Sequence, residues 1–151
     1  MIINKKPYTP EKLFNIACRN AIQKDLIAVK QKYFNQNSMN GFVKCQETNI
    51  LSKWMELAVD HRQPNTFSMI VERFKEINSI KVDRIEYKSN VENLILFQDE
   101  KLTQSFIKYH SEKANLRIVR KECNASRTAL ARVKRNSKDL FVEQKNQLSL
   151  F

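Results

Sequence analysis

Glycine and proline are scarce in this sequence. Of its 151 residues, 1 is Gly and 3 are Pro. Glycine provides the positive-φ backbone that tight turns and phosphate-binding loops require. A single glycine therefore excludes a Walker-type loop and a dinucleotide-binding fingerprint, and we expect most of the chain to form helices or regular strands.

Long hydrophobic runs are also missing. The longest, such as Leu94 to Phe97, are far too short to cross a bilayer, and no hydrophobic segment of signal-peptide length follows the first residues. The three cysteines, Cys18, Cys45 and Cys123, are odd in number and widely spaced. That argues against a disulfide framework and fits a reducing compartment. We expect a cytoplasmic protein without a membrane partner.

Acidic residues are outnumbered by basic ones. The chain has 27 Lys and Arg against 16 Asp and Glu, a formal net charge of +11. Between Lys113 and Lys138, nine basic residues accompany a single acidic one, Glu122. Such an excess favours a polyanionic partner, because each neutralised phosphate releases condensed counterions. Nucleic acid is the first expectation, an anionic membrane surface the second, and charge that only keeps the protein dissolved is the plain alternative.

Three helices are predicted ahead of the basic segment. Thr9 is suited to cap a helix, Pro10 fits its first turn, and apolar residues then recur at three- and four-residue spacing to about residue 35. The apolar stripe from Phe67 to Ile77 predicts a helix over 66–78, and a third is expected over 100–113. A composition of 42% hydrophobic and 28% charged residues is that of one globular domain.

Short strands complete the predicted fold. They are expected over residues 42–45, 54–62 and 115–119, with a final helix over 121–133 and an irregular or strand-like connection over 81–87. The predicted fold class is α+β, mainly helical with a small antiparallel hairpin. Beyond residue 133 we expect a basic, frayed tail.

The residues that carry chemistry lie in two stretches. The chain has 2 histidines, and one of them, His61, follows Asp60 at the end of an apolar run that reads as a strand. The second stretch places Asn115 before a short strand and Asn124 on the helix that follows. An aspartate and a histidine at one strand end can present a metal-binding carboxylate beside an imidazole base.

Together these stretches resemble the HNH endonucleases, whose core is strand, loop, strand and helix around one divalent metal. The resemblance rests on Asp60-His61, Asn115 and Asn124, which occur in the family's order. It implies a ββα-metal core over 42–62 and 114–133, joined to an N-terminal helix over 10–35 and a basic tail over 134–151. The span from His61 to Asn115 is longer than the usual loop, and implies a helical insertion over 63–113.

The resemblance also implies an activity, the metal-dependent hydrolysis of DNA phosphodiester bonds. His61 would be the general base, and Asn115 would orient its ring through a hydrogen bond. Asp60 and Asn124 would hold one divalent ion, Mg or Mn, since hard cations prefer oxygen ligands. Double-stranded DNA is the expected partner, and three arginines are candidates for clamping phosphate, Arg62, Arg117 and Arg127.

No structural zinc is expected. Many family members hold one with two Cys-x-x-Cys pairs, but here Thr48 stands three residues after Cys45, and Arg120 stands three before Cys123. The surviving thiols cannot complete a four-coordinate site. We expect Cys45 and Cys123 to be small buried residues close in space.

Plainer interpretations stay open. Taken singly, Asp60 fits a turn, Asn124 fits a helix cap, and the second histidine, His110, fits a structural place in its helix. Two other functions are compatible with the charge. One is a nucleic-acid-binding module without catalysis, and the other is a basic module that binds an acidic protein.

Overall fold

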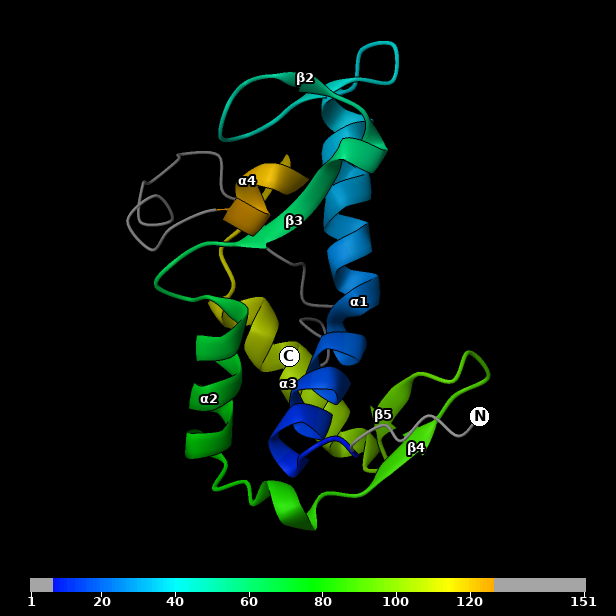
Figure 1. The fold of residues 1–151 in the computed structure, drawn as a ribbon, viewed down its shortest axis with the longest axis vertical. Helices are drawn as coiled ribbons and strands as arrows, with labels where there is room; N and C mark the ends of the chain where they lie inside the picture. Colours follow the sequence, from blue (N-terminus) through cyan, green and yellow to red (C-terminus); the bar gives the residue numbers. More distant parts are fainter. Residues whose placement is uncertain (1–6, 127–151) are drawn as a thin grey trace, which may run out of the picture.

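The structure, a computed structural model, describes residues 7–126 and has the α+β fold expected, mainly helical with short antiparallel strand pairs (Figure 1). The elements in chain order are α1 (Pro10–Asn37), β1 (Val43–Lys44), β2 (Leu51–Ser52), the 3-10 helix η1 (Trp54–Glu56), β3 (Leu57–His61), α2 (Phe67–Ile77), the 3-10 helix η2 (Val82–Arg84), β4 (Tyr87–Ser89), β5 (Ile95–Phe97), α3 (Glu100–Lys113), β6 (Leu116–Arg120) and α4 (Lys121–Ser126).

Helix α1 packs against several other elements of the described structure. It begins where the sequence indicates, because Thr9 accepts a hydrogen bond from the Lys12 amide at 3.2 Å and Pro10 occupies the first turn. It packs against α2, α3, β3 and β5, and Figure 1 shows it running along the length of the molecule. No helix within residues 7–126 combines the length and the apolar character that a membrane span requires.

The strands β3 and β6 form an antiparallel pair in which Leu57 lies opposite Arg120 and His61 lies opposite Leu116. α4 follows β6 directly and packs against both strands. The result is a strand, strand and helix unit assembled from two distant segments. The expected final helix begins at Lys121 as predicted, and its part beyond residue 126 lies outside the described residues, as does the predicted tail.

The segment between β3 and β6 forms α2, α3 and an antiparallel hairpin of β4 and β5. Both helices agree with the predicted ranges. The sequence predicts an irregular or strand-like connection over 81–87 but not the hairpin that follows, because a side chain builds its turn. The Asn90 carboxamide oxygen accepts hydrogen bonds from the amides of Glu92 and Leu94, and Asn93 takes a positive φ of 59°.

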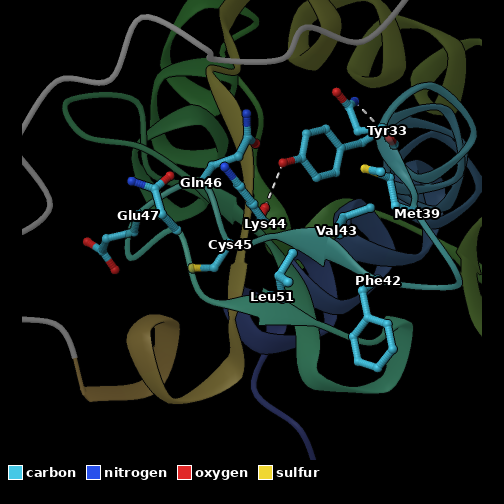
Figure 2. Close-up of a pocket in the computed structure, with 11 residues that line it drawn as sticks. Tyr33, Met39, Phe42, Val43, Lys44, Cys45, Gln46, Glu47 and Leu51 are labelled. Carbon is cyan, nitrogen blue, oxygen red and sulfur yellow. Dashed lines mark hydrogen bonds between the residues drawn. The ribbon is translucent and has the colours of Figure 1, made fainter.

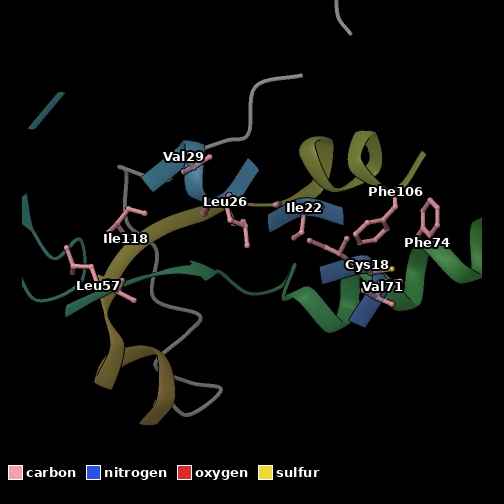
Figure 3. Packing of buried hydrophobic residues seen from close by; sticks show 14 of the residues in the cluster. Cys18, Ile22, Leu26, Val29, Leu57, Val71, Phe74, Phe106 and Ile118 are labelled. Carbon is pink, nitrogen blue, oxygen red and sulfur yellow. The ribbon is translucent and has the colours of Figure 1, made fainter. Parts of the chain in front are cut away.

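The hydrophobic core is continuous along α1 and joins the β3–β6 strand pair to the helices α2 and α3. At one end Leu26 and Val29 lie beside Leu57 and Ile118 of the strand pair, as Figure 3 shows. At the other end, Cys18 and Ile22 pack among side chains of α2 and α3, namely Val71, Phe74 and Phe106. This shared core fixes the strand pair relative to both inserted helices.

Candidate active site

The candidate site lies where β3 ends. Asp60 is the ladder partner of Arg117, and His61 is the ladder partner of Leu116. Successive side chains of a strand leave on opposite faces. Asp60 and His61 are therefore neighbours along the backbone, but their side chains have different surroundings.

On the first face, Asp60 is paired with a buried arginine. Nε of Arg117 lies 3.2 Å from Oδ2 of Asp60, and Nη2 of Arg117 lies 3.0 Å from Oε1 of Glu47. Arg117 is 2% exposed and Asp60 is 3% exposed. One guanidinium thus bridges two carboxylates in a largely dry environment, which strengthens their attraction.

The loop that carries Glu47 is held against β6 by its neighbour Gln46. The Gln46 amide donates to the Ile118 carbonyl oxygen at 2.9 Å, and the Ile118 amide donates to the Gln46 side-chain oxygen at 2.6 Å. These two bonds extend the strand pair by a third segment. They place the Glu47 carboxylate within reach of Arg117.

On the second face, His61 meets the only other histidine of the chain. The Nε2 atoms of His61 and His110 are 2.8 Å apart, and the Phe67 ring lies against His61 with centroids 5.5 Å apart. His61 is 7% exposed and His110 is fully buried. Burial lowers the pKa of His61 to about 4 and that of His110 to about 3, so both rings are neutral near pH ~7.

A positive charge lies close to this histidine pair. The Arg19 guanidinium sits over the Phe67 ring, 4.0 Å from its centroid, and its charge contributes to lowering the pKa of both histidines. Arg19 also lines a cleft of about 680 Å³ between the start of α1 and the start of α2, which Lys12 and Asn15 border as well. Sequence analysis missed Arg19 because nothing in the helical pattern of α1 distinguishes it from other polar positions.

The hydrogen-bonding partner of the His61 ring is His110. Asn115 stands one position before Leu116, the ladder partner of His61, so strand alternation favours the opposite face for its side chain. Its backbone oxygen accepts the Arg62 amide at 2.9 Å, which extends the ladder by one step. The role of Asn115 in orienting His61 stays a prediction, and His110, for which the sequence favours a structural place in its helix, is the residue in contact with the His61 ring.

Of the three arginines predicted to clamp phosphate, two are buried and the third lies outside the described residues. Arg62 and Arg117 are each 2% exposed, so neither guanidinium reaches a phosphate at the surface. Arg117 is engaged with Asp60 and Glu47. Arg127 lies outside the described residues. Arg19 is an exposed residue whose positive charge acts on both histidine rings.

Asn124 lies on α4 and is half-buried. The preceding residue, Cys123, is within hydrogen-bonding reach of Glu47 and of the Cys45 thiol. Because Glu47 contacts Arg117, which contacts Asp60, α4 packs on the face of the strand pair that carries Asp60. The helix that bears Asn124 and the strand that bears Asp60 therefore lie together.

The Cys45 thiol is held by two backbone hydrogen bonds, one from its own turn and one from β6. Sγ of Cys45 accepts the Thr48 amide at 3.4 Å and the Arg120 amide at 3.3 Å, and these bonds lower the pKa of its thiol against the effect of burial. Figure 2 shows Cys45 and Glu47 on this turn, with the Tyr33 hydroxyl donating to the Lys44 carbonyl oxygen beside them. All three cysteines are free thiols.

The donors near Asp60 suit a hard cation better than a soft one. Within residues 7–126 no group of three or more His, Cys, Asp and Glu side chains is arranged to hold a metal ion. Asp60 and Asn124 offer a carboxylate and an amide oxygen, and ions such as Mg²⁺ complete their shell with water and substrate phosphate. The chemistry of this donor pair is compatible with such an ion.

The fold thus places Asp60 and the helix of Asn124 on one face of the strand pair, and His61 with His110 on the other face, where the charge of Arg19 acts on both rings. It does not bring Arg62 or Arg117 to the surface. No family model, curated protein or solved structure matches this chain.

Proposed function

We propose that this protein is a metal-dependent HNH-type endonuclease that hydrolyses phosphodiester bonds in DNA. The observation that supports it is the antiparallel pairing of β3 with β6. This pairing joins Asp60 and His61 to the helix of Asn124, although the two segments are far apart in the chain. Strand, strand and helix occur in the order that the resemblance implies.

In this proposal His61 acts as the general base. Its neutral ring takes a proton from the water that attacks phosphorus. A divalent ion, when bound, would stabilise the negative charge of the transition state and the leaving oxygen. Asp60 and Asn124 would hold that ion, and Arg117 fixes the position of the Asp60 carboxylate through the contact of 3.2 Å.

The proposed binding to DNA rests on the positive charge of the protein. The net charge of +11 favours a polyanion, and Arg19 offers an exposed guanidinium beside the histidine pair. Guanidinium groups match the geometry of phosphate oxygens. We assign Arg19 to a phosphate next to the bond that is cut, and we place the protein in the cytoplasm with double-stranded DNA as its substrate.

A second candidate function is a DNA-binding module that has lost catalysis. The low pKa of His61, about 4, favours it, because a base works best when its pKa lies near the working pH. The ion pair between Asp60 and Arg117 favours it as well, since Arg117 occupies part of the carboxylate. Both candidates predict binding that weakens steeply with salt.

The test is cleavage of supercoiled plasmid in the presence of magnesium, manganese or chelator. Wild-type protein is compared with His61→Ala and Asn124→Ala, and with Lys24→Ala as a control on the exposed face of α1. Metal-dependent nicking that is lost in His61→Ala, with the fold intact by circular dichroism, supports the nuclease. Nicking that survives His61→Ala overturns this site.

The same assay separates the second candidate. Plasmid that stays intact with every metal, yet shifts in a gel at low salt, supports the binding module. Failure to bind DNA at low salt, together with tight binding to an acidic protein, would overturn both.

A further inference from the structure

We propose that His110 is the positioning residue for His61, and that it accepts the Nε2–H of His61 so that Nδ1 is the atom that takes the proton from water. This inference rests on the proposed function. It begins from the separation of 2.8 Å between the two Nε2 atoms, which is hydrogen-bonding distance. A neutral imidazole carries one proton, so one ring donates and the other accepts.

The contact decides which atom of His61 is available for chemistry. Because Nε2 is used by the bond to His110, Nδ1 is the ring nitrogen that remains outside it. Nδ1 can accept a proton only if the resting ring carries its hydrogen on Nε2. For His61 to act as a base, it must therefore be the donor and His110 the acceptor.

His110 is placed to hold this arrangement. It lies on α3, is fully buried, and packs against Phe106 with ring centroids 6.2 Å apart. Phe67 closes the other side of the His61 ring. The surrounding aromatic rings fix the orientation of both imidazoles. Nδ1 of His61 is therefore held in one position to take the proton from water.

The other nitrogen of His110 does not decide the direction of the bond. Its Nδ1 is buried and has no hydrogen-bond partner among the described residues. Whichever ring donates, that atom stays unsatisfied, as a donor in one arrangement and as an acceptor in the other. The requirement that His61 accept a proton at Nδ1 selects the first arrangement.

The same contact acts during the reaction. As the water O–H bond breaks and the Nδ1–H bond forms, His61 becomes a cation and the water oxygen becomes the attacking hydroxide. The Nε2–H of the cation then points at the lone pair of a neutral ring. A hydrogen bond from a charged donor is stronger than one between neutral groups, so His110 stabilises the protonated base as well as orienting it.

Two substitutions separate this role from packing. His110→Gln keeps an acceptor near the position of Nε2, and His110→Phe fills the space with a ring that cannot accept. A residue that only packs would tolerate Phe better than Gln, because the site is buried. A positioning residue would tolerate Gln better than Phe.

The direct test is ¹⁵N NMR of protein labelled at histidine, without DNA or metal. The chain has 2 histidines, so the spectrum contains few ring nitrogens, and the variants assign them. We expect His61 to show a protonated Nε2 and an unprotonated Nδ1, in the wild type and in His110→Gln. In His110→Phe we expect a mixture of both forms. A protonated Nδ1 on His61 in the wild type would overturn the proposal.

Plasmid cleavage supplies the second readout. Cleavage by His110→Phe should fall roughly 10- to 100-fold, as for other residues that orient a catalytic group, and His110→Gln should recover part of it. Equal activity of Phe and Gln variants that are both folded would also overturn the positioning role. A wild type that never cuts DNA rejects the nuclease, whereas the NMR result judges the hydrogen bond independently.

Discussion

Asp60 and Arg117 are direct partners across the β3–β6 ladder, and their side chains form a buried ion pair of 3.2 Å. Both are almost fully enclosed, so water contributes little to either charge. The attraction between them compensates for the loss of hydration only while both partners are present. The stability of a buried, charged Asp60 carboxylate therefore depends on Arg117, the residue opposite it in the ladder.

Removing Arg117 should destabilise the fold strongly. Arg117→Met leaves the Asp60 and Glu47 carboxylates without their shared guanidinium, and we expect a loss of about 3–5 kcal/mol in the free energy of unfolding. Urea denaturation followed by circular dichroism measures it. Arg73→Met, which alters an exposed arginine bonded to Asn65, should stay within about 0.5 kcal/mol of wild type.

A double variant tests whether the effect comes from the ion pair. Asp60→Asn combined with Arg117→Met should cost clearly less than the two single changes added together, because the uncompensated charge of Asp60 is gone and only that of Glu47 remains. Additive costs would show that Arg117 stabilises the fold by packing rather than by charge.

Stability should fall as the solution is acidified. The pKa of His61 is lowered to about 4 and that of His110 to about 3, whereas an unfolded histidine titrates near ~6.5. The unfolded chain therefore binds protons first, and the stabilisation present above pH ~6.5 is lost as the pH falls towards the folded values. Between pH ~6.5 and ~5 the slope should approach about 1.4 kcal/mol per pH unit for each proton taken up.

Urea titrations at a series of pH values measure this slope. His110→Gln removes one of the two buried rings and should flatten the curve in the same range. A wild-type stability that is constant from pH ~6.5 to ~5 would mean that the histidines become protonated without unfolding.

Arg19 should contribute to DNA affinity without sequence preference. Arg19→Gln removes an exposed cation, so binding should weaken equally on unrelated sequences and the salt dependence should fall by about one phosphate contact. Fluorescence anisotropy at several salt concentrations measures both. Arg84→Gln, an exposed arginine on η2 outside the cleft of Arg19, is the control, and an equal effect of the two changes would contradict a specific role for Arg19.

Chelation should separate activity from folding. Because only Asp60 and Asn124 are assigned to the ion, and the core around α1 is built without it, EDTA should abolish nicking and leave the melting temperature unchanged. Adding back manganese should restore nicking. A large drop in melting temperature on chelation would indicate a structural metal, with Cys45 and Cys123 as the first residues to examine.

Local signals in the sequence were sufficient for the helices. Thr9 and Pro10 mark the start of α1, and the apolar stripe from Phe67 predicts α2 almost to the residue, because both features depend only on neighbours in the chain. The strands β3 and β6 were also expected. Their register was not, since it depends on which faces the core covers.

The side chains around the site could not be predicted from the sequence, because their contacts also depend on how distant segments pack together. In the sequence, Arg117 cannot be distinguished from an arginine at the surface. Its position opposite Asp60 in the strand pair makes it a buried partner of that carboxylate. His110 lies in an ordinary helical pattern, and its contact with His61 arises because α3 ends beside β3. The β4–β5 turn depends on Asn90, whose side chain replaces a glycine-type turn signal.

The pairing of His61 with Leu116 has a consequence for folding. The helices α1, α2 and α3 form from residues that are close in the chain, whereas β3 must wait for β6 before it gains its partner. Contacts between distant segments form slowly. During synthesis β3 therefore stays without its ladder partner until residues 116–120 have left the ribosome, so Asp60 and His61 receive their final surroundings late.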